Sequence, residues 1–349
     1  MITSAPGGLR AACDDVTEAT AGDTVDGVTA RWVARPASTE EVSAVLRAAA
    51  SLGLRVVARG SGTRLSWGLP PAALELIVDT SRMNAMLAHA AGDLVLTAQA
   101  GLRMTDLRDA LAPHRQRLAL DGRDVLRGTI GGVIATGASG PLRYQYGSPR
   151  DLVIGITVVL ADGTIARSGG AVVKNVAGYD LAKLYTGSLG TLGVITEAVF
   201  RLHPLPEATR WITTHTADAQ HAAAAVAAIR ASQHHPAALE VNRDEPGGTA
   251  TIGVAIEGVS AGIAARARAV ASLLGARAVV TERPPDWWGT PPPSPYATVT
   301  CEPTGLAELI ATAPGTLRGS AGAGVLAAGL DDGDQLGADL TRLRAIAAR

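Results

Sequence analysis

Three glycine-rich segments contain the residues of this sequence best suited to chemistry. They read RGSGTR at 59–64, GTIGGVIATGASG at 128–140 and GSLGTLG at 187–193. Glycines let backbone N–H groups converge on an anion, and residues with positive φ form concave nests for phosphate oxygens. The chain has 40 glycines, so each segment alone is as well explained by a tight turn. Together, beside apolar runs and hydroxyl side chains, they predict a site for a pyrophosphate and a flat ring.

The middle segment has five glycines among thirteen residues, with apolar side chains in the gaps. We expect these apolar residues, Ile130, Val133 and Ile134, to hold a strand and a turn against the core. The glycines would form the wall of the binding site, because a ligand can approach the backbone closely where side chains are absent.

The common nucleotide-binding motifs do not account for these glycines. The P-loop pattern GxxxxGK[ST] does not occur in the sequence. A GxGxxA pattern occurs at Gly322, Gly324 and Ala327, but no helix is predicted to start from it, as the dinucleotide-binding motif requires. A P-loop is therefore excluded, and a Rossmann dinucleotide fold is disfavoured.

Reactive side chains are few near these segments. The only two lysines, Lys174 and Lys183, lie in one stretch, KNVAGYDLAKL, with Tyr179 between them. A chain that otherwise uses arginine could need the compact ammonium group there, so Lys174 and Tyr179 are the candidate catalytic residues. Alternatively, the lysines are solvated charges and the tyrosine is a buried side chain with a bonded hydroxyl. No residue is identified as a catalytic base.

Bulk composition excludes several classes of protein. A net charge of −1 with 18% charged residues provides no field for binding nucleic acid. The sequence shows no signal peptide and no apolar run long enough to span a bilayer, which predicts a cytoplasmic protein that reaches a membrane only through partners. Cys13 and Cys301 are too few for a zinc or iron–sulfur site, so any cluster must belong to a partner. The adjacent His234 and His235 are better explained as charges at a helix C-terminus than as metal ligands.

The first half of the chain alternates short strands and helices. The clearest helix, 39–52, starts at a capping box in which Ser38 accepts from the backbone and Glu41 reaches back. A hairpin is predicted at 151–170, because Asp162-Gly163 joins two β-branched runs. Further strands are predicted within 55–60, 74–82, 93–101 and 191–202, and further helices within 105–112 and 179–187.

Pro204 and Pro206 mark a boundary that divides the chain into domains 1–206 and 207–349. Beyond it the predicted elements follow the order β-α-β-β-α-β, which is the ferredoxin-like split motif. A strand, a helix, two strands and a helix are predicted to follow within 296–349. The Trp287–Trp288 pair that precedes them is either an anchor for a partner or a partly buried pair.

Five motifs occur in order across residues 31–206: RPASTEEVSAVLRAA, VVARGSGTR, VDTSRM, GTIGGVIATGASGPLRYQYGSPRDLVIG and VVKNVAGYDLAKLYTGSLGTLGVITEAVFRLHPLPE. They resemble the FAD-binding domain of the vanillyl-alcohol oxidase and p-cresol methylhydroxylase (PCMH) family. The resemblance implies an α+β fold with a PCMH-type FAD-binding domain of two α/β subdomains, followed by a smaller ferredoxin-like α/β cap domain. Some members attach the flavin to a histidine in the first loop. The matching position here is Thr63, which implies FAD bound non-covalently.

The resemblance also assigns residues to the cofactor. The first glycine segment would wrap the pyrophosphate, the second would line the flavin and its ribityl chain, and the third would touch the ring or the adenosine side. Asp79 and Ser81 would mark the end of a neighbouring strand. The implied cofactor-binding residues are Arg59, Gly60, Ser61, Gly62, Thr63, Asp79, Ser81, Gly128, Thr129, Gly132, Gly137, Ser139, Gly140, Gly193 and Ile195.

Within the family, ASGPLRYQYGSPRD and KNVAGYDLAKL followed by GSLGTLG are most similar to the E subunit of bacterial glycolate oxidase. The large catalytic subunits of this group read GSEGTLG where this chain has Leu189. They also carry a histidine-rich metal motif in their C-terminal half, whereas this chain has no histidine after His235. The resemblance implies an FAD-binding subunit that works with a catalytic flavin subunit and an iron–sulfur subunit to oxidise glycolate or another 2-hydroxy acid. A stand-alone FAD-dependent dehydrogenase and a non-catalytic flavin-retaining scaffold subunit are the alternatives.

Overall fold

The computed structural model describes residues 6–170 and 180–347, and the chain folds as two compact units. The first unit comprises residues 1–118, 124–138 and 148–204, and the second comprises 119–123, 139–147 and 205–349. Two short segments that precede the expected boundary at 206 therefore pack with the second unit. None of the helices in the described residues is long and apolar enough to cross a membrane.

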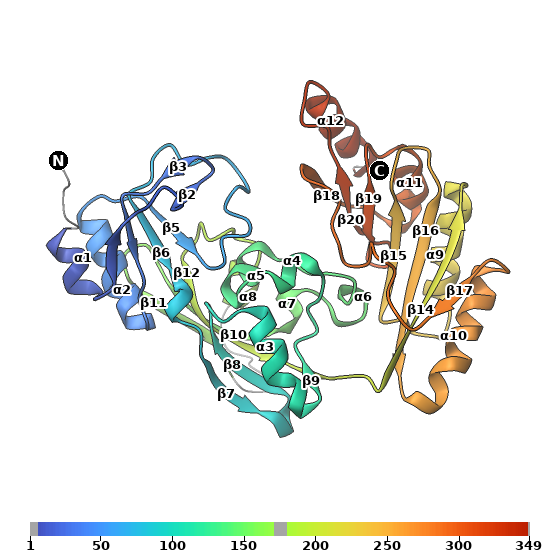
Figure 1. Cartoon of the computed structure of the whole chain (residues 1–349), viewed down its shortest axis with the longest axis horizontal. Coiled ribbons are helices and arrows are strands. Elements are labelled where there is room, and N and C mark those ends of the chain that lie inside the picture. The colour runs from blue at the N-terminus through green and yellow to red at the C-terminus, as the bar shows by residue number, and fades with distance from the viewer. Residues whose placement is uncertain (1–5, 171–179, 348–349) are drawn as a thin grey trace. The chain divides into compact units, whose positions relative to one another are not determined.

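One sheet of the first unit is mainly parallel. Its order is β1-β4-β6-β5, in which β4, β6 and β5 are parallel and β1 pairs antiparallel at the edge. The strands are β1 (Val16–Glu18), β4 (Trp32–Ala34), β6 (Leu76–Asp79) and β5 (Val56–Arg59), with helices α1 (Gly7–Ala12) and α2 (Thr39–Ser51) beside them (Figure 1). The predicted start of α2 is confirmed: the Glu41 N–H donates to Ser38 Oγ over 3.1 Å. Glu41 reaches one residue further back than expected, because its Oε2 accepts from the Ala37 N–H.

The other main sheet of the first unit is antiparallel throughout. Its order is β11-β10-β12-β8-β7. The predicted hairpin is confirmed as β10 paired with β11, and Gly163 has a φ of +83° in the turn between them. The strands are β7 (Met86–Ala90), β8 (Val95–Gln99), β10 (Val153–Val159), β11 (Ile165–Gly169) and β12 (Val194–Arg201).

The middle glycine segment is a helix, α5 (Ile130–Thr136), so the expectation of a strand and a turn was wrong. Ile130, Val133 and Ile134 are each at most 1% exposed. Their spacing of i, i+3 and i+4 places all three on one face of a helix, which the count of glycines obscured. Thr129 caps the helix by accepting from the Gly132 N–H, and Gly137 ends it with a φ of +63°.

Short elements complete the part of the first unit that the structure describes. The predicted helices within 105–112 and 179–187 are confirmed as α3 (Met104–Leu111) and α8 (Leu181–Tyr185). The remaining elements are β2 (Thr24–Val25), β3 (Val28–Thr29), β9 (Gln116–Arg117), β13 (His203–Pro204), α4 (Arg123–Leu126), α7 (Pro149–Leu152) and three single 3₁₀ turns, η1 (Thr80–Arg82), η2 (Ala91–Asp93) and η3 (Ala112–His114).

The second unit is built on a seven-stranded antiparallel sheet of order β17-β14-β16-β15-β19-β20-β18 (Figure 1). Its first four strands have the 4-1-3-2 order of the ferredoxin-like motif, as the sequence predicted. The last three strands lengthen the sheet beyond that motif. The elements are β14 (Ala208–Thr216), α9 (Ala219–Ala231), β15 (Ala238–Arg243), β16 (Ala250–Gly258), α10 (Ser260–Leu274), β17 (Val279–Thr281), β18 (Tyr296–Thr300), η4 (Pro303–Gly305), α11 (Leu306–Thr312), β19 (Leu317–Ser320), β20 (Val325–Gly329) and α12 (Leu336–Ala347), together with the short α6 (Arg143–Tyr146).

The two faces of strand β15 differ in chemistry. Leu239 and Val241 belong to the apolar core that the strands share with the helices. Because side chains alternate along a strand, Glu240 and Asn242 lie on the opposite face. Both are buried, at 4% exposed each. A charged residue type is therefore enclosed in the middle of the sheet, a position that no sequence pattern indicated.

The structure places three features of the second unit that the sequence analysis singled out. Trp287 and Trp288 are half-buried, and their rings pack against Gly253, where a Cβ atom would come within 2.9 Å of both. The GxGxxA pattern at 322–327 lies in the β19–β20 hairpin and does not open a helix, which confirms that it is no dinucleotide motif. His234 and His235 follow the end of α9, and no group of three or more metal-ligand side chains occurs among the described residues.

Candidate functional site

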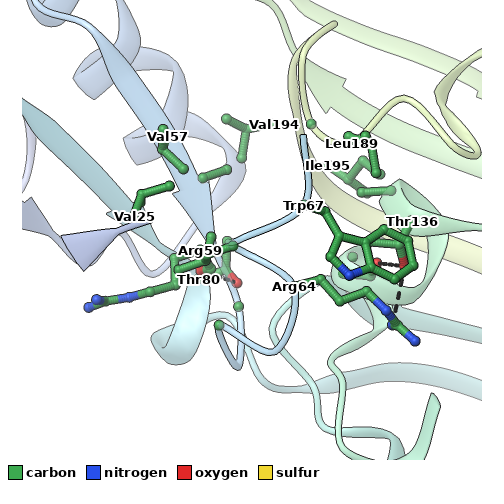
Figure 2. A pocket seen from close by; sticks show the side chains of 18 of the residues that line it. Val25, Val57, Arg59, Arg64, Trp67, Thr80, Thr136, Leu189, Val194 and Ile195 are labelled. Atoms are coloured by element: carbon green, nitrogen blue, oxygen red, sulfur yellow. Dashed lines mark hydrogen bonds between the residues drawn. The ribbon is translucent and has the colours of Figure 1, made fainter. Parts of the chain in front are cut away.

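A pocket of about 390 Å³ in the first unit is lined by all three glycine segments, within the size range typical of ligand sites (Figure 2). Segments that are far apart in sequence thus meet in space, as predicted. Apolar side chains form much of its wall, with Val25 and Val57 from one part of the unit and Val194 and Ile195 from another.

The first segment enters the pocket directly from strand β5. Gly60 lies against the cap of helix α5, where a Cβ atom would overlap Thr129 Oγ1. Gly62 has a φ of +71°, which favours glycine. The amide N–H groups of residues 61–63 donate to no hydrogen bond within the described part of the chain. This loop therefore presents uncommitted donors to the pocket, which is what a bound anion requires.

Helix α5 contributes shape to the pocket and not donors. The N–H groups of its first turn are already engaged: Ile130 donates to Leu102 O at 2.9 Å, Gly131 to Ala100 O at 2.7 Å, and Gly132 to Thr129 Oγ1. Gly131 and Gly132 line the pocket without side chains. The middle segment thus supplies a close wall, while the first segment supplies the hydrogen bonds.

The third segment docks on the end of helix α5. The Gly187 N–H donates to Ile134 O at 3.0 Å, and the Leu189 N–H donates to Ala135 O at 2.7 Å. Leu189 holds this contact with a φ of +54°, a strained conformation for a side chain without a polar atom. Strand β12 then begins at Val194, so the loop fixes the position of the apolar wall.

The residues that the sequence analysis assigned to the cofactor divide into three groups, and the candidate catalytic residues form a fourth. Arg59, Gly60, Ser61, Gly62, Thr63, Thr129, Gly132, Gly193 and Ile195 line the pocket. Asp79, Ser81, Gly128 and Gly137 lie in the same unit outside its lining, and Ser139 and Gly140 lie in the second unit. Lys174 and Tyr179, the candidate catalytic residues, lie outside the described residues.

The Arg59 side chain pairs with two carboxylates, one of which is Asp79. Its Nη1 lies 2.8 Å from Asp23 Oδ1 and its Nη2 lies 2.8 Å from Asp79 Oδ2. The Ser81 N–H donates to the other oxygen of Asp79. Hydrogen bonds from Thr20 and the charge of Arg59 hold the pKa of Asp23 at about 2. The Arg59 side chain is therefore committed to two carboxylates, and only its backbone is placed to serve a ligand.

Sequence reasoning missed a second arginine, Arg64, at the other end of the first segment. Its side chain lines the pocket and is 10% exposed. Arg64 is the last residue of the motif RGSGTR, and its position five residues after Arg59 was the signal available in the sequence.

Residues 30–169 match the sequence family described as an FAD binding domain. The chain carries a PCMH-type FAD-binding domain. Its cofactor is FAD, because the curated relatives of this domain include FAD-linked oxidoreductases.

The relatives of the FAD-binding domain come from bacteria, an archaeon and eukaryotes. The chain is 38% identical over 208 residues to glycolate oxidase subunit GlcD of Bacillus subtilis, which covers 60% of this chain and 44% of the relative. It is 39% identical over 173 residues to D-lactate dehydrogenase of Archaeoglobus fulgidus, covering 49% of this chain and 38% of the relative. It is 39% identical over 186 residues to D-2-hydroxyglutarate dehydrogenase of Xanthomonas citri pv. viticola, covering 51% of this chain and 39% of the relative. The chain thus spans less than half the length of these curated relatives.

Solved structures agree on the fold. A structure of alkyldihydroxyacetonephosphate synthase has a TM-score of 0.70 and 19% sequence identity, covering 92% of this chain and 71% of that chain. A second structure of the same enzyme has a TM-score of 0.62 and 21% identity, covering 75% of this chain and 54% of that chain. At this identity the likeness shows the architecture alone, an α+β fold.

The pocket fits the chemistry of FAD. A dinucleotide carries an anionic pyrophosphate and a flat apolar ring system. The loop at 61–63 offers uncommitted N–H donors, and α5 with Val194 and Ile195 offers close apolar walls. The ionisable residues in the described lining, Arg59 and Arg64, are both cationic.

Proposed function

We propose that this chain is the FAD-binding, E-type subunit of a glycolate oxidase-like complex that oxidises glycolate or another 2-hydroxy acid to the 2-oxo acid. The observation that carries the proposal is the convergence of the three glycine segments on one pocket of the FAD-binding domain. The relatives support the reaction class, because they include a glycolate oxidase subunit and dehydrogenases of D-lactate and D-2-hydroxyglutarate.

The residues of the pocket support a role that depends on partners. Oxidation of a 2-hydroxy acid needs a group that takes the hydroxyl proton while a hydride leaves the substrate. The described lining holds no carboxylate and no imidazole that could do so. We propose that a catalytic flavin subunit supplies this group, and that an iron–sulfur subunit completes the complex in the cytoplasm.

In this proposal, the pocket would hold FAD, which would supply the electron-transfer chemistry of the reaction. The loop at 61–63 holds its pyrophosphate through backbone N–H groups, and helix α5 and strand β12 exclude water from its ring. Thr63 offers no side chain for a covalent flavin link, so the cofactor is held by these contacts alone. Acid precipitation should release all the flavin into the supernatant.

Anaerobic reduction of the purified full chain tests the proposal. We expect the flavin absorbance to persist when glycolate or D-lactate is added to the chain alone, and to bleach when the partner subunits are added. Bleaching by the chain alone would show a stand-alone dehydrogenase, and no bleaching in either case would show a scaffold. A chain that binds no FAD on reconstitution would overturn the proposal entirely.

A further inference from the structure

The two arginines at the ends of the first glycine segment differ in how well the protein compensates their positive charges. Arg59 makes two ion pairs of 2.8 Å with the buried carboxylates of Asp23 and Asp79. Its positive charge is therefore more than balanced within the protein. This arginine stabilises the loop and has little charge left for a ligand.

Arg64 is much less well satisfied. Its Nη2 lies 3.3 Å from Asp124 Oδ2, and its Nη1 lies 3.5 Å from Thr136 Oγ1. Charge-assisted hydrogen bonds of arginine are normally 2.7–2.9 Å long, so both contacts are weak. The Nε atom is buried and has no hydrogen-bond partner in the described part of the chain. A largely buried guanidinium with so little compensation is costly unless another anion completes its shell.

The surroundings of Arg64 hold it at the pocket. Its Cζ atom lies 4.9 Å from the centre of the Trp67 ring, and Figure 2 shows it beside Trp67 and Thr136 while Arg59 points away from them. Trp67 and Thr136 line the pocket with it. The cation–π contact and the Thr136 hydroxyl fix the guanidinium in place without neutralising it.

We propose that Arg64 binds an anionic group of FAD and is the main cationic side chain of the cofactor site. This inference rests on the proposed placement of FAD in the pocket. The group is either the diphosphate, which is charged in both redox states, or the flavin ring, which gains negative charge on reduction. In both cases the Arg64 guanidinium donates hydrogen bonds to the anion and replaces the long contacts to Asp124 and Thr136.

The test compares Arg64→Gln with the full-length wild type and with Arg55→Gln. Arg55 pairs with Glu75 and is 60% exposed, so its substitution removes the same charge away from the pocket. Dissociation constants for FAD and for ADP, which has the diphosphate but no flavin ring, would be measured by titration of the apoprotein. The midpoint potential of the bound FAD would be measured in parallel.

If the diphosphate is the anion, Arg64→Gln should weaken FAD and ADP alike by about tenfold or more, with an unchanged midpoint potential. If the ring is the anion, ADP binding should be unchanged and the midpoint potential should fall. Arg55→Gln should match the wild type in all three measurements. Arg64→Lys keeps the charge and should recover part of the lost affinity or of the shift in midpoint potential. This variant guards against a glutamine variant that fails to fold.

Wild-type values in Arg64→Gln for FAD, ADP and potential would overturn the inference. That result would leave the proposed function intact as long as the wild type binds FAD. Failure of the wild type to bind FAD would instead overturn the proposed function.

Discussion

Glu240 gives a prediction about the stability of the second unit. Its side chain is 4% exposed in the middle strand β15, and Oε1 has no hydrogen-bond partner in the described part of the chain. Burial, with a smaller contribution from the negative charge of Asp121, raises the pKa of Glu240 from 4.5 to about 8. The Ser320 hydroxyl and, to a smaller extent, the charge of Arg143 oppose this shift in the pKa and are outweighed. The native state therefore holds a proton at neutral pH that the unfolded chain releases.

The sign and size of the effect follow from proton linkage. Between pH 4.5 and pH 8 the folded chain binds more protons at Glu240 than the unfolded chain, so stability falls as pH rises. With these two pKa values the loss between pH 5 and pH 8 is about 3 kcal/mol. Glu240→Gln has nearly the same shape and cannot titrate. The difference in unfolding free energy between Glu240→Gln and the wild type should therefore shift by about 3 kcal/mol in favour of the variant between pH 5 and pH 8.

Urea denaturation at several pH values between 5 and 8 would measure this difference. Tryptophan fluorescence is a suitable signal, because Trp211, Trp287 and Trp288 lie in the second unit. Glu245→Gln is the matched control, since it makes the same substitution at an exposed position of the same unit. A constant difference between wild type and Glu240→Gln across the range would refute the reasoning.

Three further substitutions test the described geometry. Gly60→Ala places a Cβ atom against Thr129 Oγ1 and should weaken FAD binding at least tenfold by titration, whereas Gly92→Ala, with open space around it, should not; equal affinities would contradict the contact. Leu189→Gly removes the strain of a left-handed conformation, which costs about 1–2 kcal/mol. The greater freedom of glycine in the unfolded chain opposes folding by about 0.5–1 kcal/mol, so thermal unfolding should show a small net gain in stability. Arg243 is fully buried and donates to the carbonyls of Ile310, Ala313 and Gly315. Arg243→Met leaves them unpaired and should cost about 3 kcal/mol or more in urea unfolding, while a loss under about 1 kcal/mol would show that water replaces it.

Local sequence signals predicted the elements whose cause is local. The Ser38 cap, the Asp162-Gly163 turn and the β-α-β-β-α-β order each depend on residues close in sequence, and the structure confirms all three. The convergence of the glycine segments was also predictable, because all three carried the same unusual composition.

Other features depend on tertiary contacts that no local pattern encodes. Helix α5 was missed because its glycines indicated a turn, although Thr129 and the spacing of Ile130, Val133 and Ile134 already indicated a capped helix. Arg59 was assigned to the ligand because its carboxylate partners, Asp23 and Asp79, lie 36 and 20 residues away. Glu240 was missed because an isolated glutamate in a strand gives no sign of which face it occupies.

The second unit takes in 119–123 and 139–147 as well as the C-terminal half of the chain, which makes it discontinuous in sequence. These segments are bonded into it: the Arg123 N–H donates to Gly289 O, and the Tyr146 hydroxyl donates to Glu257. A single crossover near residue 206 would therefore separate both segments from the sheet on which they pack. In protein engineering, this unit cannot be exchanged between relatives as one cassette, and a chimera would have to transplant all three pieces together.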